Sequence, residues 1–171
     1  MGGTFDHLHA AHKLLLHAAL FITEVRLIVG VISAKLLASK TNANLIESLE
    51  QRLNSVNGFL RRCGLGSIIP YVVEIEDALG PTAWDPEVTA IAVSRETMGG
   101  AREVNRVRGS KGLSILDVLS VDVISGTLES DSGEDILRTV DLGSVSEDQL
   151  KHMKMGSTGV REWMAKQQPK V

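Results

Sequence analysis

The chain has 171 residues, which is enough for one domain with a sizeable buried core. Its 43% hydrophobic and 23% charged residues are ordinary for a globular protein, and 18 Lys and Arg against 21 Asp and Glu leave a net charge of -3. This balance argues against a nucleic-acid-binding surface, which would need a basic excess, but it allows a local cluster of donors that holds a small anion.

The sequence predicts a cytoplasmic protein without a membrane span. Cys63 is the only cysteine, so no disulfide can form within the chain, and a reducing compartment is expected. No basic leader followed by an apolar core opens the chain, so we expect no signal peptide. The most apolar stretch, Leu14 to Ile32, is interrupted by His17, Glu24 and Arg26 and therefore predicts a helix followed by a buried strand.

The first half of the chain alternates helix and strand. A Leu- and Ala-rich run predicts a helix over His12–Thr23, and a nearly continuous β-branched run predicts a buried strand over Val25–Val31. Leu and Val at helical spacing predict an amphipathic helix from about Asn44 to Arg62. A second strand is expected over Ile68–Ile75, where Pro70 indicates a strand start or an edge position.

The second half continues this alternation. After a loop marked by Gly and Pro, a strand is predicted over Thr89–Ser94 and a helix over Gly99–Arg108. A further alternating strand is predicted over Leu116–Ile124. Its expected inward positions are Leu116, Val118, Val121 and Val123.

The C-terminal part predicts a long loop and two helices. Residues 125–144 are rich in Gly, Ser, Asp and Thr and are expected to form the loop. Ser146 and Gln149 make a capping-box pattern for a short helix, and Ser157 is placed to cap a last helix that runs to about Gln168.

The expected fold is therefore α/β, a single domain over residues 1–171 with a parallel sheet and helices on both faces. Its first strand is unusual. A phosphate-binding glycine turn normally follows a strand, yet Met1 stands directly before Gly2 and Gly3. We expect this first strand to be missing or truncated, which would leave ladder donors and acceptors unpaired.

The densest chemical signal is GGTFDHLHAAH, residues 2–12, which opens into the first helix. Glycines let the backbone approach a phosphate, and a helix N-terminus offers free N–H groups. His9 and His12 are spaced so that both imidazoles can point toward one anion. Two alternatives stay open: the histidines could bind zinc, although no HEXXH pattern is present, or the turn could have no function.

This run resembles the first signature of the nucleotidyltransferase superfamily, a GTFD turn followed by H-x-G-H. Five later blocks, in consistent order, resemble the archaeal and eukaryotic phosphopantetheine adenylyltransferases. They are VGVISAKLLASK (29–40), LIESLEQR (45–52), LGPTAWDPEVTAIAVSRET (79–97), NRVRGSKGL (105–113) and GSTGVR (156–161). The likeness implies a Rossmann-like nucleotidyltransferase fold and an enzyme that transfers AMP from ATP to 4'-phosphopantetheine, giving dephospho-CoA and pyrophosphate in coenzyme A synthesis.

The resemblance also implies roles for the matched residues. His12, His9 and Lys40 are the expected catalytic residues, with His12 stabilising the transition state and Lys40 meeting the pantetheine phosphate or the α-phosphate. The implied ATP-binding residues are Gly3, Thr4, Phe5, His9, His12, Ser157, Thr158 and Arg161. The implied substrate-binding residues are Thr4, Lys40, Ser94, Glu96, Thr97, Asn105 and Arg108. Mg²⁺ is expected to accompany ATP, and no residue is assigned as a metal ligand.

Three of these residues also have a plain structural interpretation. Lys40 could be a solvated lysine, since Lys35 also lies near the strand end. Asn105 and Arg108 could simply brace their helix.

The residue types fit this chemistry. The phosphate of 4'-phosphopantetheine is mostly dianionic at neutral pH and can attack the α-phosphorus of ATP without a general base. The protein then has to bring two anions together and spread the growing charge, which His, Lys, hydroxyl and helix N-terminal donors can do. The expected partners are these two small molecules, with no nucleic acid and no membrane.

Two positions depart from the family pattern. Ala11 replaces the glycine between the histidines, and Gly156 replaces the first serine of the closing motif. These departures keep two alternatives open: a weakly active or inactive nucleotide-binding relative, and a cytidylyltransferase of the same superfamily.

Overall fold

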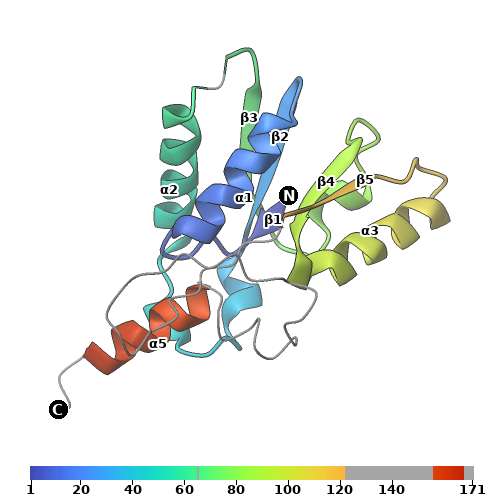
Figure 1. The fold of residues 1–171 in the computed structure, drawn as a ribbon. Coiled ribbons are helices and arrows are strands. Elements are labelled where there is room, and N and C mark those ends of the chain that lie inside the picture. The colour runs from blue at the N-terminus through green and yellow to red at the C-terminus, as the bar shows by residue number, and fades with distance from the viewer. Residues whose placement is uncertain (65, 122–155, 168–171) are drawn as a thin grey trace, which may run out of the picture.

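The computed structural model describes residues 1–64, 66–121 and 156–167, and its described strands all run parallel (Figure 1). The strands are β1 (Gly2–Gly3), β2 (Arg26–Ile32), β3 (Ile69–Ile75), β4 (Ala90–Ser94) and β5 (Asp117–Val121). The helices are α1 (Ala10–Phe21), α2 (Leu49–Arg62), α3 (Met98–Ser110) and α5 (Ser157–Gln167). Among these described helices, none combines the length and apolarity needed to cross a bilayer.

The strands form two groups, β1–β2–β3 and β4–β5, and share one core. β1 pairs through Gly2 and Gly3 with Gly30 and Val31 of β2. The buried cluster that contains Val29 of β2 also contains Ala92 of β4. The two groups therefore lie next to each other, and Figure 1 shows β1 at the place where they meet.

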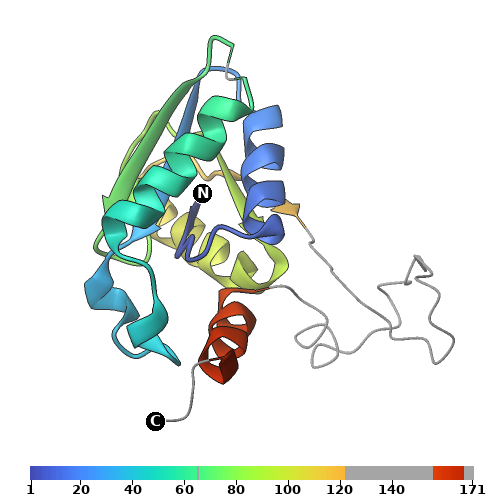
Figure 2. The same cartoon turned by 90° about the vertical axis from the view of Figure 1, so that its left-hand side faces the viewer.

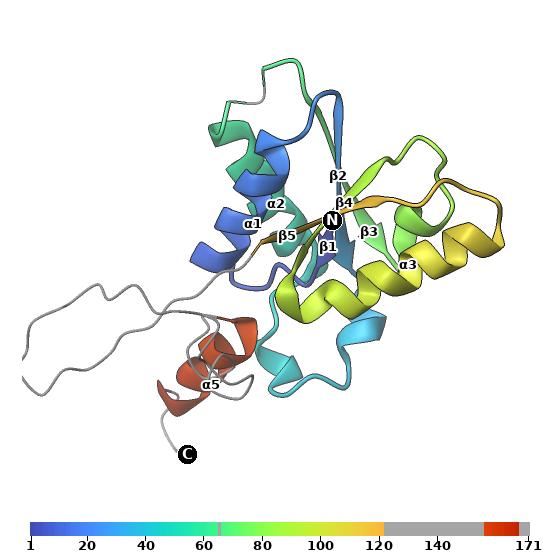
Figure 3. The same ribbon diagram turned by 45° about the vertical axis from the view of Figure 1, so that its right-hand side comes forward.

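Helices cover both faces of the strands, as the sequence predicted. α1 and α2 lie together on one face (Figure 2), where Leu16 and Val56 are fully buried. α3 lies on the other face (Figure 3), where Ile91 and Val93 of β4 pack with Val104. The alternation of strand side chains explains this, because successive residues of β4 point to opposite faces.

The short first strand is present and paired. The Met1 carbonyl accepts a hydrogen bond from the Gly30 N–H at 2.9 Å, and the Met1 amino group donates to the Ile28 carbonyl at 3.1 Å. Burial lowers the pKa of this amino group to about 6. The expectation of a missing strand is thus wrong, and the first strand is present but short.

The start of α2 also corrects the sequence interpretation. The predicted helix began at about Asn44, but a separate 3₁₀ turn occupies Ala43–Leu45 and α2 begins at Leu49. Ser48 caps it by accepting a hydrogen bond from the Gln51 N–H, and the Gln51 side chain accepts one from the Ser48 N–H. This capping box satisfies helix-terminal donors at Ser48 and so stops the helix from extending backwards.

Most other predicted boundaries agree with the structure to within two residues. Of the predicted inward positions of β5, Leu116 is buried, but Val118 is 40% exposed. Val118 pairs with Ile91, on the face that α3 covers. Among the described strands β5 has β4 as its one neighbour, so the other side of Val118 is left uncovered by a strand. Val123, the loop over 125–144 and the helix at Ser146–Gln149 lie outside the described residues. The last helix starts at Ser157 itself and is described to Gln167.

Candidate active site

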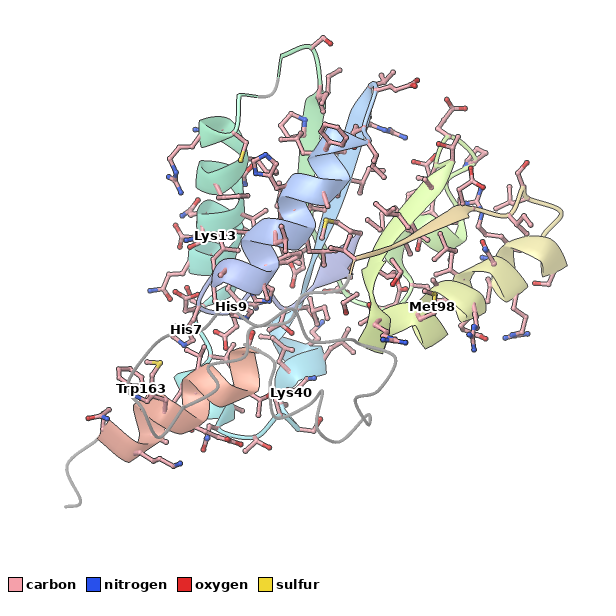
Figure 4. The ribbon with its side chains drawn as sticks, viewed as in Figure 1. His7, His9, Lys13, Lys40, Met98 and Trp163 are labelled. Carbon is pink, nitrogen blue, oxygen red and sulfur yellow. The ribbon has the colours of Figure 1, made fainter. Side chains whose placement is uncertain are left out.

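Most predicted site residues gather at the carboxyl ends of the parallel strands. α1 and α3 begin at this end, and α5 lies across it (Figure 1). In Figure 4, His9 at the start of α1, Met98 at the start of α3 and Lys40 after β2 all lie on this side of the molecule. This is the edge at which open parallel sheets bind ligands.

The turn between β1 and α1 has an unusual backbone. Phe5 and His7 have φ of 51° and 46°, which is the left-handed region that L-residues rarely adopt. Phe5 is 1% exposed and Asp6 is fully buried. Such a conformation persists only when its surroundings hold it, and the contacts of Asp6 show how.

Asp6 ties the turn to two distant segments. Its Oδ1 accepts a hydrogen bond from the Glu47 N–H at 2.9 Å, and its Oδ2 accepts one from Arg161 Nη1 at 2.7 Å. Arg161 is 2% exposed and also donates to the Thr41 carbonyl at 3.1 Å and to Thr158 Oγ1 at 3.3 Å. Its guanidinium thus fastens α5 to the turn, and the part of Arg161 in ATP binding stays a prediction.

His9 and His12 lie face to face at the start of α1. Their ring centroids are 3.9 Å apart with an interplanar angle of 22°, and the Phe5 ring lies 5.2 Å from that of His12. Burial, reinforced by His9, lowers the pKa of His12 to about 3, and burial also lowers the pKa of His9. Both imidazoles are therefore neutral at pH 7, and each carries one N–H donor.

Ser157 brings α5 to this histidine pair. Its hydroxyl donates to the Asp6 carbonyl at 3.3 Å, and its Oγ lies 3.5 Å from His9 Nε2. Within the described residues, His9 Nδ1 and His12 Nδ1 are buried without a hydrogen-bond partner. The structure thus brings together the turn, the two histidines and the start of α5, as the sequence predicted.

The remaining predicted residues at this edge come from the ends of β2 and β4. Lys40 is exposed, whereas the Lys35 ammonium lies 3.4 Å from the Glu76 carboxylate, so Lys40 is the better candidate. At the end of β4, the hydroxyls of Ser94 and Thr97 lie 3.2 Å apart. The side chain predicted at Glu96 lies outside the described structure.

Asn105 and Arg108 lie elsewhere, and their contacts fit the interpretation that they brace their helix, while their contact with substrate stays a prediction. The Asn105 amide exchanges hydrogen bonds with Leu116, and buried Arg108 donates to the carbonyls of Ser114, Thr82, Asp85 and Val88. These partners precede β4 and β5, at the opposite end of the strands. Arg108 is ten residues beyond Met98, so it lies about 15 Å along α3 from the site.

Arg52 and Glu47 are parts of the site that the sequence analysis did not assign. Glu47 Oε2 accepts the His7 N–H at 2.6 Å, and Arg52, 1% exposed, donates to the Thr4 carbonyl at 2.9 Å. The sequence did carry a signal for Arg52, namely a charged residue on the apolar face of a helix. Arg52 stands three residues after Leu49 and four before Val56.

One cluster has the composition of a metal site. Ligand atoms of Asp6, His7 and Glu47 all lie within 4.8 Å of one another. These groups already bind protein, however: His7 Nε2 lies 2.9 Å from the Leu45 carbonyl, and Asp6 accepts from Arg161. The stacked pair of His9 and His12 is not part of this cluster among the described residues.

The sequence matches known proteins over most of its length. The sequence model of the family described as cytidylyltransferase-like matches residues 1–162. A phosphopantetheine adenylyltransferase of Saccharomyces cerevisiae is 40% identical over 81% of the chain, which spans 45% of that relative. A phosphopantetheine adenylyltransferase of Methanothermobacter thermautotrophicus is 34% identical over 73% of the chain and 73% of the relative. The chain thus spans less than half of the yeast relative and most of the archaeal one.

A solved structure has the same fold. The crystal structure of a protein with unknown function from Archaeoglobus fulgidus aligns with a TM-score of 0.60 at 24% identity. The alignment covers 72% of this chain and 96% of the other.

Proposed function

The chain belongs to the cytidylyltransferase-like family, and on that premise we propose that it is a phosphopantetheine adenylyltransferase that transfers AMP from ATP to 4'-phosphopantetheine. The observation that carries the proposal is the convergence of neutral His9 and His12 with Ser157 beside the turn at Thr4 and Phe5. The printed names of the yeast and archaeal relatives support the choice of substrate.

In the proposed reaction, the turn and the histidines hold the phosphates of ATP. An oxygen of the 4'-phosphopantetheine phosphate attacks the α-phosphorus, and the bond from that phosphorus to the bridging oxygen of pyrophosphate breaks. The attacking dianion needs no base, so neutral His9 and His12 can serve as N–H donors. Donors that are fixed in place before the reaction stabilise the charge that develops on the phosphoryl oxygens.

Lys40 and the residues at the end of β4 would bind the second substrate, 4'-phosphopantetheine. Lys40 is exposed after β2, where its ammonium can approach a phosphate from solvent. Ser94 and Thr97 place hydroxyls beside the start of α3. These roles rest on the position of each residue at the common edge.

Mg²⁺ would enter as part of the ATP substrate, where it neutralises phosphate charge. The described carboxylate nearest the turn, Asp6, is fully buried and bound to Arg161 and the Glu47 N–H. Both of its oxygens already accept protein hydrogen bonds, so we do not assign Asp6 as a magnesium ligand.

The departure from the family pattern at Gly156, in the closing motif, introduces no steric conflict with the proposed activity. Among the described residues, a Cβ added at Gly156 would meet nothing within 4 Å, and glycine there removes one hydroxyl. The absence of a clash allows the serine to be restored as a gain-of-function test.

The proposed function is tested by incubating the purified chain with ATP, Mg²⁺ and 4'-phosphopantetheine and following dephospho-CoA by mass spectrometry. Parallel reactions contain CTP with small phosphorylated alcohols. We expect dephospho-CoA and pyrophosphate in equal amounts. Product with CTP alone would support a cytidylyltransferase, and ATP binding without product in any mixture would support an inactive nucleotide-binding relative.

A further inference from the structure

Arg52 donates hydrogen bonds to backbone carbonyls at the ends of the neighbouring strands β1 and β2. It lies in the first turn of α2, is 1% exposed, and its guanidinium makes three hydrogen bonds, all to backbone carbonyls. Nη1 donates to Thr4 at 2.9 Å and to Ile32 at 2.8 Å, and Nε donates to Glu47 at 3.1 Å. Burial lowers the pKa of Arg52, against the opposing effect of nearby Asp6 and Glu47, yet a guanidinium stays charged at neutral pH.

The bond to Ile32 ends the ladder between β1 and β2. In that ladder the Met1 amino group donates to Ile28 and the Met1 carbonyl accepts from Gly30. Parallel ladders repeat every two residues, so continuing this one would pair the Phe5 N–H with the Ile32 carbonyl. Arg52 donates to that carbonyl instead, and Phe5 N–H makes no hydrogen bond within the described chain.

The hydrogen bond from Arg52 to the Thr4 carbonyl sets the direction of the Phe5 N–H. The described peptide bonds are all trans, and in a trans peptide the C=O and the following N–H point in opposite directions. Since the Thr4 carbonyl points at Arg52, the Phe5 N–H points to the other side of the turn. The positive φ of Phe5 keeps the chain out of a strand conformation at this point.

We propose that Arg52 is a positioning residue for ATP, because it ends the β1–β2 ladder and holds the Phe5 N–H free to donate to a phosphate oxygen. This inference rests on the proposed function, since it takes the phosphates of ATP as the acceptor. Arg52 itself stays under the turn and acts through the Thr4–Phe5 peptide. Neither composition nor motif matching shows this role, because it depends on which carbonyls the guanidinium reaches.

Arg52→Lys tests the proposal because it keeps the charge but cannot donate to three carbonyls in the same geometry. We expect the KM for ATP to rise about tenfold or more, as for loss of a hydrogen bond to a charged group. The KM for 4'-phosphopantetheine should change much less. The control is Leu60→Ala, a 1% exposed core position of the same helix, which lowers stability without touching the turn. An unchanged KM for ATP in Arg52→Lys, or an equal rise in Leu60→Ala, would overturn the proposal.

A second measurement needs no variant and no turnover. In ¹H–¹⁵N spectra of the wild-type chain, the Phe5 amide should shift when MgATP is added and saturate with the ATP affinity measured by calorimetry. A Phe5 amide that does not respond while ATP binds would overturn the role of Arg52. Absence of dephospho-CoA with a responding Phe5 amide would instead contradict the proposed reaction and leave this inference standing.

Discussion

His12 shows how burial favours the neutral form of an imidazole. A charged imidazole here would lose its hydration and face His9 at stacking distance, so the neutral form is favoured. A neutral ring can donate one N–H to a phosphoryl oxygen without the cost of burying a full charge. The neutral form suits the proposed role of His12, which stays a prediction.

Replacing His12 with alanine should lower turnover far more than it weakens ATP binding. Loss of one donor that is held in place for the transition state typically costs about 100- to 1,000-fold in rate. The measurement is kcat for dephospho-CoA formation beside the Kd for ATP by calorimetry. A variant that keeps more than about a third of wild-type turnover would contradict the transition-state role.

The low pKa of His12 also predicts how stability depends on pH. The folded-state pKa of about 3 lies below the ordinary 6.5, so the unfolded chain binds a proton that the folded chain does not. The stabilisation is complete above pH 6.5 and is lost as pH falls from 6.5 toward 3, with a slope of about 1.4 kcal/mol per pH unit. Urea unfolding of wild type and His12→Gln between pH 7 and pH 4 measures this. Parallel curves for the two proteins would show that His12 is not the cause.

Lys40→Ala should mainly raise the KM for 4'-phosphopantetheine, because its exposed ammonium is proposed to meet that substrate's phosphate. Loss of a charge-assisted hydrogen bond predicts a rise of about tenfold or more. The matched variant is Lys35→Ala, whose ammonium lies by Glu76. If Lys35→Ala has the effect and Lys40→Ala does not, the wrong lysine has been chosen.

Among the elements, α5 is held to the turn by a buried ion pair. Arg161 of α5 and Asp6 of the turn are 2% and 0% exposed in their side chains, with 2.7 Å between Nη1 and Oδ2. The pair joins residues 155 positions apart in the chain and sets Ser157 beside His9. The docking of α5 and the position of Ser157 beside His9 therefore share one contact.

Arg161→Met should lower the free energy of unfolding by about 3–5 kcal/mol, because it leaves the Asp6 carboxylate buried without its partner. Adding Asp6→Asn should recover part of the loss, since the unpaired charge is then removed. The control is Arg106→Met, which breaks an exposed ion pair with Glu103 and should cost far less, because water screens that pair. Equal losses in both arginine variants, measured by urea unfolding, would argue against a special role for the buried pair.

For the molecule as a whole, the first strand matters because it lies where the two strand groups meet. It has two residues and pairs with only part of the seven-residue β2. β2 begins at Arg26, but its pairing toward β1 starts at the Ile28 carbonyl, which the Met1 amino group reaches. That amino group is buried, and burial lowers its pKa to about 6. A longer first strand would exchange this buried terminus for ladder hydrogen bonds.

Adding about five apolar, β-branched residues before Met1 should raise the melting temperature by several degrees. At this chain length, each kcal/mol of stability corresponds to about 2–4 °C. The control is a Gly/Ser extension of equal length, which also removes the buried amine but has little tendency to form a strand. If both extensions raise the melting temperature equally, the gain comes from removing the charge and not from strand pairing.

The periodicity of the sequence was sufficient to predict the α/β class, the parallel strands and the cover of helices on both faces. These features follow from local patterns. A β-branched run predicts a buried strand, and a 3.6-residue repeat of apolar residues predicts a helix with one buried face. The same is true of the turn at 2–12, where glycines, histidines and a helix start are neighbours in the chain. The later motif blocks identified the family through their order.

Contacts between distant residues were decided only by the tertiary structure. Asn105 and Arg108 matched a motif, yet the length of α3 carries them to the far end of the strands. Arg161 matched another, and folding buried it against Asp6, which lies at the other end of the sequence. Arg52 ends one matched motif block and is a charge on an apolar helix face, but neither pattern gave it a role. Which carbonyls it binds depends on where three separate segments meet, and no local pattern in the chain carries that information.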